Sequence, residues 1–402
     1  MTRSEWALVL LLALIQWVHI MDFMIMMPMG PRLMDQFGVT PSQMAIAISI
    51  YSLAAGVVGL LGSYLMDRWS RRTSVITLAM VLGITTIACG TTTHYGVFLV
   101  LRGLAGMAGG ALGGALFATL GDGVPAHYQG RATGIVMSGF SIAAIAGIPI
   151  GMLMANTWGC SVVFWTIGGM GLLAGVIAYG VMPMLPVQSD VTAWWQNMRL
   201  SWVNLNERHS LFTILTIAMA GFLIIPMINP YLIRNVGVAA HVIPWVYAIG
   251  GLVTLGSNQW IGRLVDRWGY RRVLGYLLPL SVIPLFGMTI LPPIPMWGVI
   301  ASTTVFFVLV SGRFVPAMAL IMGAVPSYRR GRFVSLASAL QQLGAAFASL
   351  ISSWLVHTTM GSGHLSGYGR AGLVSLGMTI LAIWFSRYRD SAHCGFKKPS
   401  LQ

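Results

Sequence analysis

The residues LMDRWSRR at positions 65–72 recur about 200 positions later as LVDRWGYRR at positions 264–272. A second pair of related stretches follows them, VPAHYQGR at 124–131 and VPSYRRGR at 325–332. Because both motifs recur in the same order and with nearly the same separation, the chain consists of two homologous halves. Both halves are strongly apolar, and a duplicated apolar bundle is typical of secondary transporters in membranes.

The composition excludes an ordinary water-soluble domain. Of the 402 residues, 56% are hydrophobic and 8% are charged, whereas soluble domains carry about 25% charged residues. A membrane-spanning helix needs about 20 apolar residues, and the sequence contains twelve stretches of that kind. We expect these spans at 6–28, 43–66, 73–92, 95–118, 131–155, 160–183, 211–233, 241–264, 273–292, 296–321, 333–356 and 370–387.

The sequence therefore predicts an all-α membrane protein with twelve transmembrane helices in two pseudo-symmetric six-helix bundles. The first bundle is expected within residues 1–185 and the second within residues 211–389. A polar cytoplasmic linker at 186–210 joins them, and a cytoplasmic tail follows at 390–402. The linker is too short to bury a core of its own, which removes most classes of enzyme.

The formal net charge of +14 does not indicate a nucleic-acid partner. Most of the 23 Lys and Arg residues fall on the side of the spans that carries both termini; Arg32, Arg234 and Arg370 fall on the other side, and Arg102 and Arg313 lie within spans. This asymmetry follows the positive-inside rule. We therefore expect a multi-pass protein of the plasma membrane, the inner membrane in a Gram-negative cell, with both termini in the cytoplasm and the lipid bilayer as a partner.

No cofactor or metal is expected. The three cysteines are scattered without paired spacing, so neither a disulfide framework nor a metal site is indicated. No nucleotide-binding loop of the Gly-x-x-x-x-Gly-Lys-Ser/Thr type is present, which argues against ATP as the energy source.

The stretches at 65–72 and 264–272 resemble the signature of the major facilitator superfamily, Gly-x-Leu-x-Asp-Arg-x-Gly-Arg-Arg, between helices two and three of each half. Both copies keep the Asp and the Arg. The departures concern the glycines: the first copy has Ser63 and Ser70 in their place, and the second copy has Gly262 and Gly269 but inserts Tyr270.

Two further stretches support this resemblance. LRGLAG at 101–106, in the fourth span, is similar to the Arg-x-x-x-Gly element of the superfamily. AGIPIG at 146–151, in the fifth span, resembles the Gly-x-Pro-x-Gly element of bacterial sugar- and purine-efflux permeases within the twelve-helix drug:proton antiporter family. The resemblance implies hinge or packing roles for Gly106, Gly147, Pro149 and Gly151.

Asp22 is the only carboxylate well inside an expected span. Placing a carboxylate at the centre of a membrane helix costs about 2.5–3.5 kcal/mol, which favours a functional role. His19 and Met26 share a helix face with Asp22, so Asp22 and His19 are candidates for proton coupling. The alternative is that Asp22 lies near the membrane surface and His19 is a packing residue.

Arg102 lies in the fourth span, where a fixed charge needs a cavity or a partner. Asp22 is the only buried acidic candidate in the first half, so we expect the two to pair. The superfamily resemblance implies that such an arginine influences proton release; a purely structural ion pair is the alternative. The repeat places Arg313 opposite Leu112 rather than opposite Arg102, which suggests a specialised role as a contact for an anionic substrate group, a countercharge, or a side chain that reaches the membrane surface.

The repeated Asp-Arg segments also predict a cytoplasmic gate. An aspartate just before a helix start meets the positive end of the helix dipole, and neighbouring arginines can pair with it across spans. The alternative is that these charges only set the topology. The expected members are Asp67, Arg68, Arg71, Arg72, Asp266, Arg267, Arg271, Arg131 and Arg332.

The superfamily fold places helices one, four, seven and ten, with two, five, eight and eleven, around a central cavity. Polar and Met side chains in these spans are the expected substrate contacts. The favoured alternative for any single polar residue is a contact between helices, and for the Met residues it is apolar packing. The candidates are Met26, Tyr51, Asn229, Tyr231, Asn258, Arg313, Gln341 and Gln342.

These features predict a proton-coupled secondary transporter that exports a small organic molecule, such as a drug, sugar, nucleoside or metabolite, by alternating access. Protons and the small-molecule substrate are the expected partners, and the expected unit is a monomer. Two alternatives stay open: an uncoupled or importing carrier on the same fold, and a non-transporting membrane receptor or assembly protein.

Overall fold

The computed structural model describes residues 1–66, 70–125, 128–182, 202–326, 330–359 and 364–387, without the side chains of 62–66, 129–131, 140–141 and 330–332. Asp67 and Arg68 of the expected gate lie outside the described residues, as do the side chains of Arg131 and Arg332. Most of the expected linker and the expected tail lie outside them as well.

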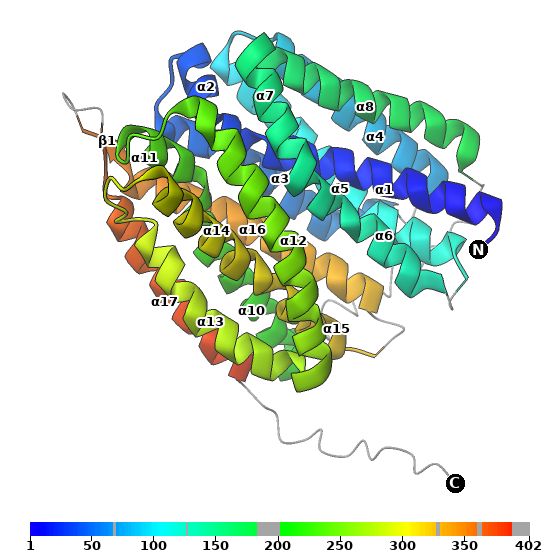
Figure 1. Cartoon of the computed structure of the whole chain (residues 1–402). Coiled ribbons are helices and arrows are strands. Elements are labelled where there is room, and N and C mark those ends of the chain that lie inside the picture. The colour runs from blue at the N-terminus through cyan, green and yellow to red at the C-terminus, as the bar shows by residue number, and fades with distance from the viewer. Residues whose placement is uncertain (67–69, 126–127, 183–201, 327–329, 360–363, 388–402) are drawn as a thin grey trace.

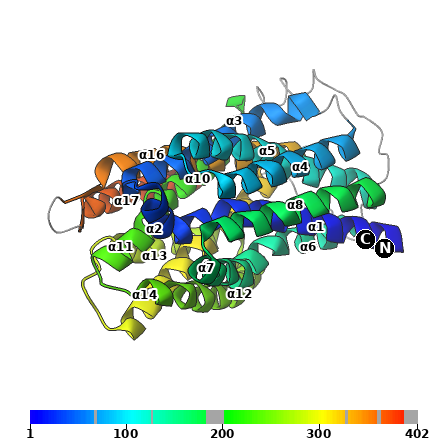
Figure 2. The same cartoon turned by 90° about the horizontal axis from the view of Figure 1, so that it is seen from above.

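The two halves of the chain lie beside one another, and within each half the long helices lie roughly alongside one another (Figures 1 and 2). The first half contains α1 (Arg3–Met24), α2 (Met26–Phe37), α3 (Pro41–Met66), α4 (Arg71–Thr91), α5 (Tyr95–Gly123), α6 (Gln129–Ile142), the π-helix η2 (Ala143–Gly147), α7 (Ile148–Trp158) and α8 (Cys160–Val181). The second half contains α10 (Leu205–Phe222), η3 (Ile225–Met227), α11 (Ile228–Arg234), η4 (Ala240–Val242), α12 (Ile243–Trp268), α13 (Tyr270–Gly287), α14 (Met296–Gly312), α15 (Phe314–Gly323), α16 (Arg330–Leu355) and α17 (Tyr368–Arg387).

Among the described residues, 11 helical segments are long and apolar enough to cross a membrane. The remaining predicted span is α13. Its first turn carries Arg271 and Arg272, and these two charged residues lower the mean hydropathy of the whole helix. It packs against α14 and α17 inside the second half. The predicted all-α membrane fold with two six-span halves is confirmed.

Several spans are interrupted where the sequence analysis expected continuous helices. The span expected at 6–28 divides at Ile25 into α1 and α2, beside Pro28 and Pro31. Proline lacks an N–H, so it leaves the carbonyl four residues earlier without its helical donor. The spans expected at 131–155, 211–233 and 296–321 are interrupted in the same way near Pro149, Pro226 and Pro316.

The expected linker also ends earlier than predicted, because α10 begins at Leu205. The Asn204 side chain caps this helix by accepting from the backbone N–H groups of Asn206 and Glu207, at 3.0 and 3.4 Å. An Asn cap and an acidic residue in the first turn both favour a helix start. The seventh span therefore begins before residue 211.

The halves share an apolar core at one end and have separate cores at the other. The shared cluster draws Met26 and Met29 from the first half and Ile224 and Met227 from the second. Near the helix ends that carry the two termini, one cluster comes only from the first half and another only from the second. We call these the shared end and the terminal end. The described halves thus share a buried apolar core at the shared end, and farther along α3 packs against α16 where Gly56 faces Leu343 and Gly59 faces Ala339.

A short hairpin closes the connection between α16 and α17 at the shared end. Strands β1 (His357–Thr358) and β2 (Leu365–Ser366) pair antiparallel. Both amide atoms of Asn235 bind the main chain of Leu365, at 3.0 and 2.9 Å. These bonds attach the hairpin to the residue that follows α11.

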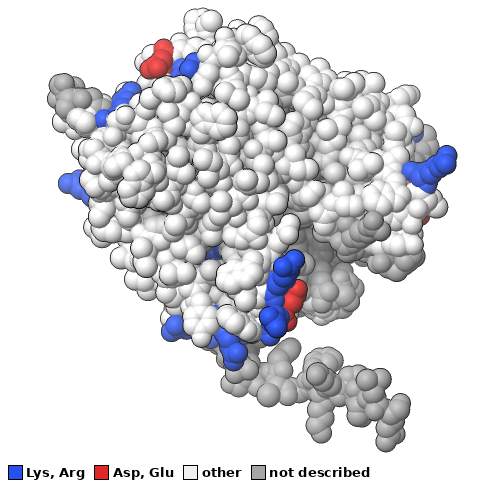
Figure 3. Space-filling model, in the orientation of Figure 1, with Lys and Arg blue, Asp and Glu red and all other residues white. Residues whose placement is uncertain are grey.

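The charged side chains lie mainly at the two ends of the molecule. Figure 3 shows a broad surface between the ends that is nearly free of Lys, Arg, Asp and Glu on the face in view. Exposed apolar side chains such as Trp354 (92% exposed) and Trp297 (75% exposed) contribute to the outer surface. A belt of this kind is what a helix bundle presents to lipid hydrocarbon.

Small residues bring α5 into close contact with α3. A Cβ at Gly106 would collide with the carbonyl oxygen of Tyr51, and a Cβ at Gly110 would collide with that of Ala55. Close packing through glycines at four-residue spacing is a common way for membrane helices to associate, because lipid provides no hydrophobic force between them. Gly106 therefore lies in a packing contact.

We expect Gly110→Val to lower the thermal unfolding temperature of the purified protein, because overpacking costs about 1–3 kcal/mol. Gly113→Val is the matched control, since a Cβ at Gly113 meets nothing within 4 Å. Thermal unfolding in detergent measures both variants. An equal decrease in unfolding temperature for both variants would contradict a specific packing contact between Gly110 and α3.

Candidate functional site

Asp22 lies in the last turn of α1 with 0% of its surface exposed. Its Oδ1 atom accepts hydrogen bonds from Arg102 Nη1 of α5 and from Thr86 Oγ1 of α4, each at 2.9 Å. Arg102 Nη2 also donates to the main-chain oxygen of Asp22 at 3.2 Å. The two residues expected to pair are in direct contact, and together with Thr86 they join the first, third and fourth spans.

Tyr51 and His19 complete this cluster. The Arg102 guanidinium lies over the Tyr51 ring at 4.4 Å from its centroid, a distance at which cation–π attraction is effective. A Cβ at Gly109 would lie 2.6 Å from the Tyr51 hydroxyl and 2.9 Å from His19 Nε2, so these groups meet against the bare backbone of α5. Tyr51 was expected in the substrate cavity; the structure places it, fully buried, beside the ion pair.

The cluster contains unused hydrogen-bonding atoms. Within the described chain, Asp22 Oδ2 and both ring nitrogens of His19 are buried without a hydrogen-bond partner. A buried polar atom left unsatisfied costs roughly 1–3 kcal/mol. Oδ2 can therefore accept a proton without the loss of an existing hydrogen bond at that oxygen.

The fifth span approaches this site through its glycines. A Cβ at Gly147 would collide with the sulfur of Met21, and a Cβ at Gly151 would lie 2.8 Å from Ile25 Cδ1. On another face, a Cβ at Gly251 of α12 would lie 2.9 Å from the carbonyl oxygen of Ala144. The π-helix η2, beside Pro149, thus contacts both the segment around Asp22 and the second half.

Arg313 is fully buried inside the second half, at the break between α14 and α15. Its Nη2 donates to the carbonyl oxygen of Ile217 at 3.0 Å, and Nη1 lies 3.5 Å from Ser281 Oγ. Arg313 therefore joins the seventh, ninth and tenth spans, much as Arg102 joins the first, third and fourth. No carboxylate pairs with it in the part of the chain that the structure describes. The structure thus places Arg313 in helix packing, whereas it was expected as a contact for an anionic substrate group, a countercharge, or a side chain that reaches the membrane surface.

Asn229 and Tyr231 also lie in contacts between elements. Asn229 is 1% exposed and donates to the main-chain oxygen of Met27, in the other half, at 3.1 Å. Its amide nitrogen also lies 3.0 Å from the Tyr247 hydroxyl. The Tyr231 hydroxyl donates to the carbonyl oxygen of Leu291 at 3.1 Å. Both residues were expected in the substrate cavity.

The remaining cavity candidates divide by burial. Met26 is completely buried in the shared core. Asn258, on α12, and Gln341 and Gln342, on α16, are partly exposed. These three polar side chains therefore stay available as substrate contacts on the second half.

The described gate residues lie at the terminal end. Arg71, at the start of α4, forms a salt bridge with Asp122, near the end of α5, with Nε and Oδ2 3.0 Å apart. Arg72 donates to the carbonyl oxygen of Tyr179 and lies 4.9 Å from the centroid of its ring. Asp122 was not among the expected gate residues, although its place two residues before the VPAHYQGR motif was a usable signal. The other described members, Asp266, Arg267 and Arg271, are exposed.

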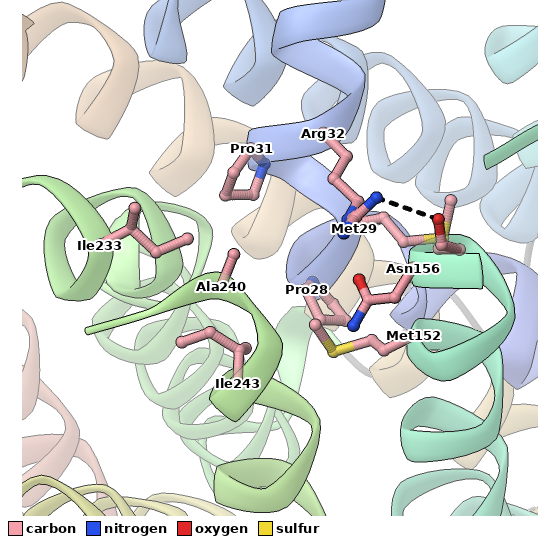
Figure 4. A pocket seen from close by; sticks show the side chains of 10 residues that line it. Pro28, Met29, Pro31, Arg32, Met152, Asn156, Ile233, Ala240 and Ile243 are labelled. Carbon is pink, nitrogen blue, oxygen red and sulfur yellow. Dashed lines mark hydrogen bonds between the residues drawn. The ribbon is translucent and has the colours of Figure 1, made fainter. Parts of the chain in front are cut away.

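A small pocket lies at the shared end, between the halves (Figure 4). Its walls are mainly apolar, with Met29 and Met152 on the first half and Ile233 and Ile243 on the second. Arg32 lines it and donates to the carbonyl oxygen of Ala155 at 3.1 Å. The described residues contain no group of three or more His, Cys, Asp and Glu side chains that could hold a metal.

We expect Arg102→Gln to lower the thermal unfolding temperature strongly, because loss of one partner from a buried ion pair costs about 3–5 kcal/mol. The double variant with Asp22→Asn should regain most of this loss, because no buried charge then lacks a partner. Arg370→Gln, at an exposed position, is the control. If the double variant were no more stable than Arg102→Gln, the loss of stability would not come from leaving the Asp22 charge without its partner.

The chain matches the sequence profile of the Major Facilitator Superfamily over residues 12–206 and 210–395. An uncharacterized MFS-type transporter of Bacillus subtilis (strain 168), YwfA, is 31% identical over 170 residues, which are 41% of this chain and 40% of that protein. The chain thus aligns with less than half the length of this relative. The multidrug resistance protein MdtG of Salmonella newport (strain SL254) is 28% identical over 280 residues, which are 66% of this chain and 69% of that protein.

Solved structures of transporters share the fold. A D-xylose-proton symporter superposes with a TM-score of 0.77 at 15% identity and covers 95% of this chain and 96% of its own. A bacterial homolog of the human lysosomal transporter Spinster, in an inward-facing and occupied conformation, gives a TM-score of 0.75 at 14% identity, with 96% and 97% covered. The profile match over nearly the whole chain decides the family: this protein belongs to the Major Facilitator Superfamily, as a multi-pass membrane transporter and not an enzyme.

Proposed function

We propose that this transporter uses the inward movement of protons to export a small organic molecule. The observation that carries the proposal is the completely buried Asp22–Arg102 pair. Ionisable groups inside a membrane bundle are expensive and commonly mark proton or substrate pathways. The pair lies beside an unpartnered histidine, which provides a second group able to exchange a proton.

Protonation would change this site in a defined way. The ionised Asp22 carboxylate holds the Arg102 guanidinium and the Thr86 hydroxyl through Oδ1. A proton on the carboxyl group removes the charge that holds Arg102, while the Tyr51 ring and the Asp22 main-chain oxygen still stabilise the guanidinium. The attachment of α1 to α5 would thus weaken without leaving the arginine unpartnered.

Alternating access would follow from the division of the apolar core. In this structure the halves share a core at one end and have separate cores at the other. If the two halves rock about the contacts that lie between these ends, they would separate at the shared end and come together at the terminal end. We assign the terminal end to the cytoplasm, because most of the described arginines, such as Arg71, Arg267 and Arg271, lie at the helix ends there. We assign residues 1–185 and 211–389 to the two rocking bundles of a monomer.

Export is favoured over import by two associations. The Gly147–Gly151 element resembles that of efflux permeases, and the relatives include a protein named for multidrug resistance. The substrate would be a drug, sugar, nucleoside or other metabolite, with Asn258, Gln341 and Gln342 as the polar contacts. An uncoupled carrier is the second candidate. The hydrogen bonds from Thr86 to the Asp22 carboxylate and from Arg102 to the Asp22 main-chain oxygen would also suit an ion pair that only holds helices together.

At the cytoplasmic face, the Arg71–Asp122 salt bridge is the described part of the proposed gate. It joins the third and fourth spans of the first half at their terminal ends. Its side chains are 13% and 30% exposed, so water can reach and replace the bond as the helices move. Asp67, Arg68, Asp266, Arg267, Arg271, Arg131 and Arg332 are the further proposed members.

We expect Asp22→Asn to abolish proton-driven transport in proteoliposomes, because an amide cannot take up and release the proton. The measurement is dissipation of an inward proton gradient on addition of sugars, nucleosides, amino acids or cationic drugs. Asp35→Asn, at an exposed position in α2, is the control and should transport normally. Full proton-coupled transport by Asp22→Asn would rule out this coupling site.

The proposed orientation predicts which engineered cysteines react from outside the cell. His94→Cys lies in the exposed loop before α5, at the shared end, and Val203→Cys lies just before α10, where the native side chain is 71% exposed. A membrane-impermeant maleimide should label the first in intact cells and the second only after lysis. The opposite pattern would reverse the assigned orientation.

A further inference from the structure

The junction between α1 and α2 contacts both the ion pair and the opposite half. Asp22 lies at the end of α1, and Met27 follows the break at Ile25. Arg102 binds the side chain and the main chain of Asp22. Asn229, from the second half, binds the main chain of Met27. One short segment thus carries the proposed proton site and a polar bond between the halves.

The bond to Met27 has a cause in the sequence. Pro31 lies inside α2 and has no N–H, so the carbonyl of Met27, four residues earlier, lacks its helical donor. In a membrane interior that carbonyl must be satisfied by the protein. Asn229 Nδ2 supplies the missing donor, at 3.1 Å from the Met27 carbonyl oxygen. The Tyr247 hydroxyl lies 3.0 Å from the same nitrogen.

An aromatic contact runs parallel to this bond. The Phe23 ring lies 5.9 Å from Phe222 of the second half and 5.4 Å from Tyr51, measured between centroids. Tyr51 in turn covers the Arg102 guanidinium. Packed rings thus connect the ion pair to the other half in addition to the main chain.

We propose that Asn229 is a positioning residue that links the charge of Asp22 to closure of the shared end through the main-chain oxygen of Met27. The link rests on the proposed proton site. While Asp22 is ionised, Arg102 holds the end of α1 so that Met27 presents its carbonyl to Asn229. Protonation removes the charged side-chain contact and leaves Arg102 only the Asp22 main-chain oxygen, which weakens its hold on this segment and the bond to Asn229 and favours opening of the shared end. By reciprocity, the closed form binds the proton more weakly, as a protein that releases protons on the cytoplasmic side requires.

Other groups around Asp22 can contribute to its pH response. The titratable and charged groups that face it are His19 on α1, Tyr51 on α3, Cys89 on α4 and Arg102 on α5. Because these groups interact closely, the pH midpoint of opening belongs to the cluster and not to one residue. Asn229 is uncharged, so its replacement changes the midpoint only through the equilibrium between closed and open forms.

The test is a distance measurement at the shared end. Spin labels at His94→Cys and Ala239→Cys, in a background without the three native cysteines, report the separation of the two halves by pulsed electron paramagnetic resonance in lipid nanodiscs from pH 5 to 9. We expect Asn229→Ala to raise the ratio of open to closed forms about fivefold. The midpoint of opening should then move to higher pH by about 0.7 units, the pH equivalent of that ratio.

Two variants separate this role from general destabilisation. Asn229→Gln keeps the amide donor and should recover part of the closed population. Asn235→Ala removes an amide with the same chemistry, which binds Leu365 within the second half, and should leave the midpoint unchanged. An unchanged midpoint in Asn229→Ala, or an equal shift in Asn235→Ala, would overturn the link.

Asp22→Asn distinguishes failure of the link from failure of the proposed function. In the spin-labelled protein, this variant should hold the shared end more open and make the distances nearly independent of pH. Distances that still follow pH as in the wild type would overturn the link. Retained proton-driven transport by the variant, with pH-independent distances, would overturn Asp22 as the proposed coupling site and leave the link between its charge and closure intact.

Discussion

The structure depends on one constraint: inside lipid, every backbone carbonyl and every charge must find its partner within the protein. Prolines interrupt several spans and free carbonyls that a regular helix would satisfy. Near the first break, Arg102 binds the carbonyl of Asp22 and Asn229 binds that of Met27. In the second half, Arg313 binds the carbonyl of Ile217, which lies inside α10 before the seventh-span break. At the first break, a buried polar side chain thus satisfies a carbonyl that proline leaves free, and the same bond holds the two halves together.

The same arrangement makes the two halves unequal. Each half has a buried arginine that joins three spans, yet Arg102 faces a carboxylate, whereas Arg313 meets a carbonyl and a hydroxyl among the described residues. A site with an ionisable acid can change its charge, and a site without one stays constant. Under the proposed function the first half responds to protons, and the second half contacts the junction of α1 and α2 through Phe222 and Asn229.

Much of the fold was predictable because bilayer thickness sets the length of each apolar span and the repeated motifs mark the two halves. The Asp22–Arg102 contact was predictable for a related reason, since a buried arginine needs an acid and the first half contains only one deep inside a span. The side-chain surroundings of Tyr51, Asn229 and Arg313 were not. A polar residue in an apolar helix can face a cavity, a neighbouring helix or a break, and its position along the chain does not distinguish these cases.

The sequence by itself determined the number and order of the spans, the internal duplication, and the presence of a buried acid with a buried base, because these follow from hydropathy and residue count. Tertiary structure alone decided which side chains meet. The rotation of each helix depends on close contacts such as that of Gly106 with α3 and that of Gly147 with Met21, and these contacts involve residues far apart in the chain. They place Tyr51 over Arg102 and Asn229 against Met27, since packing distances between helices are short enough to exclude other orientations.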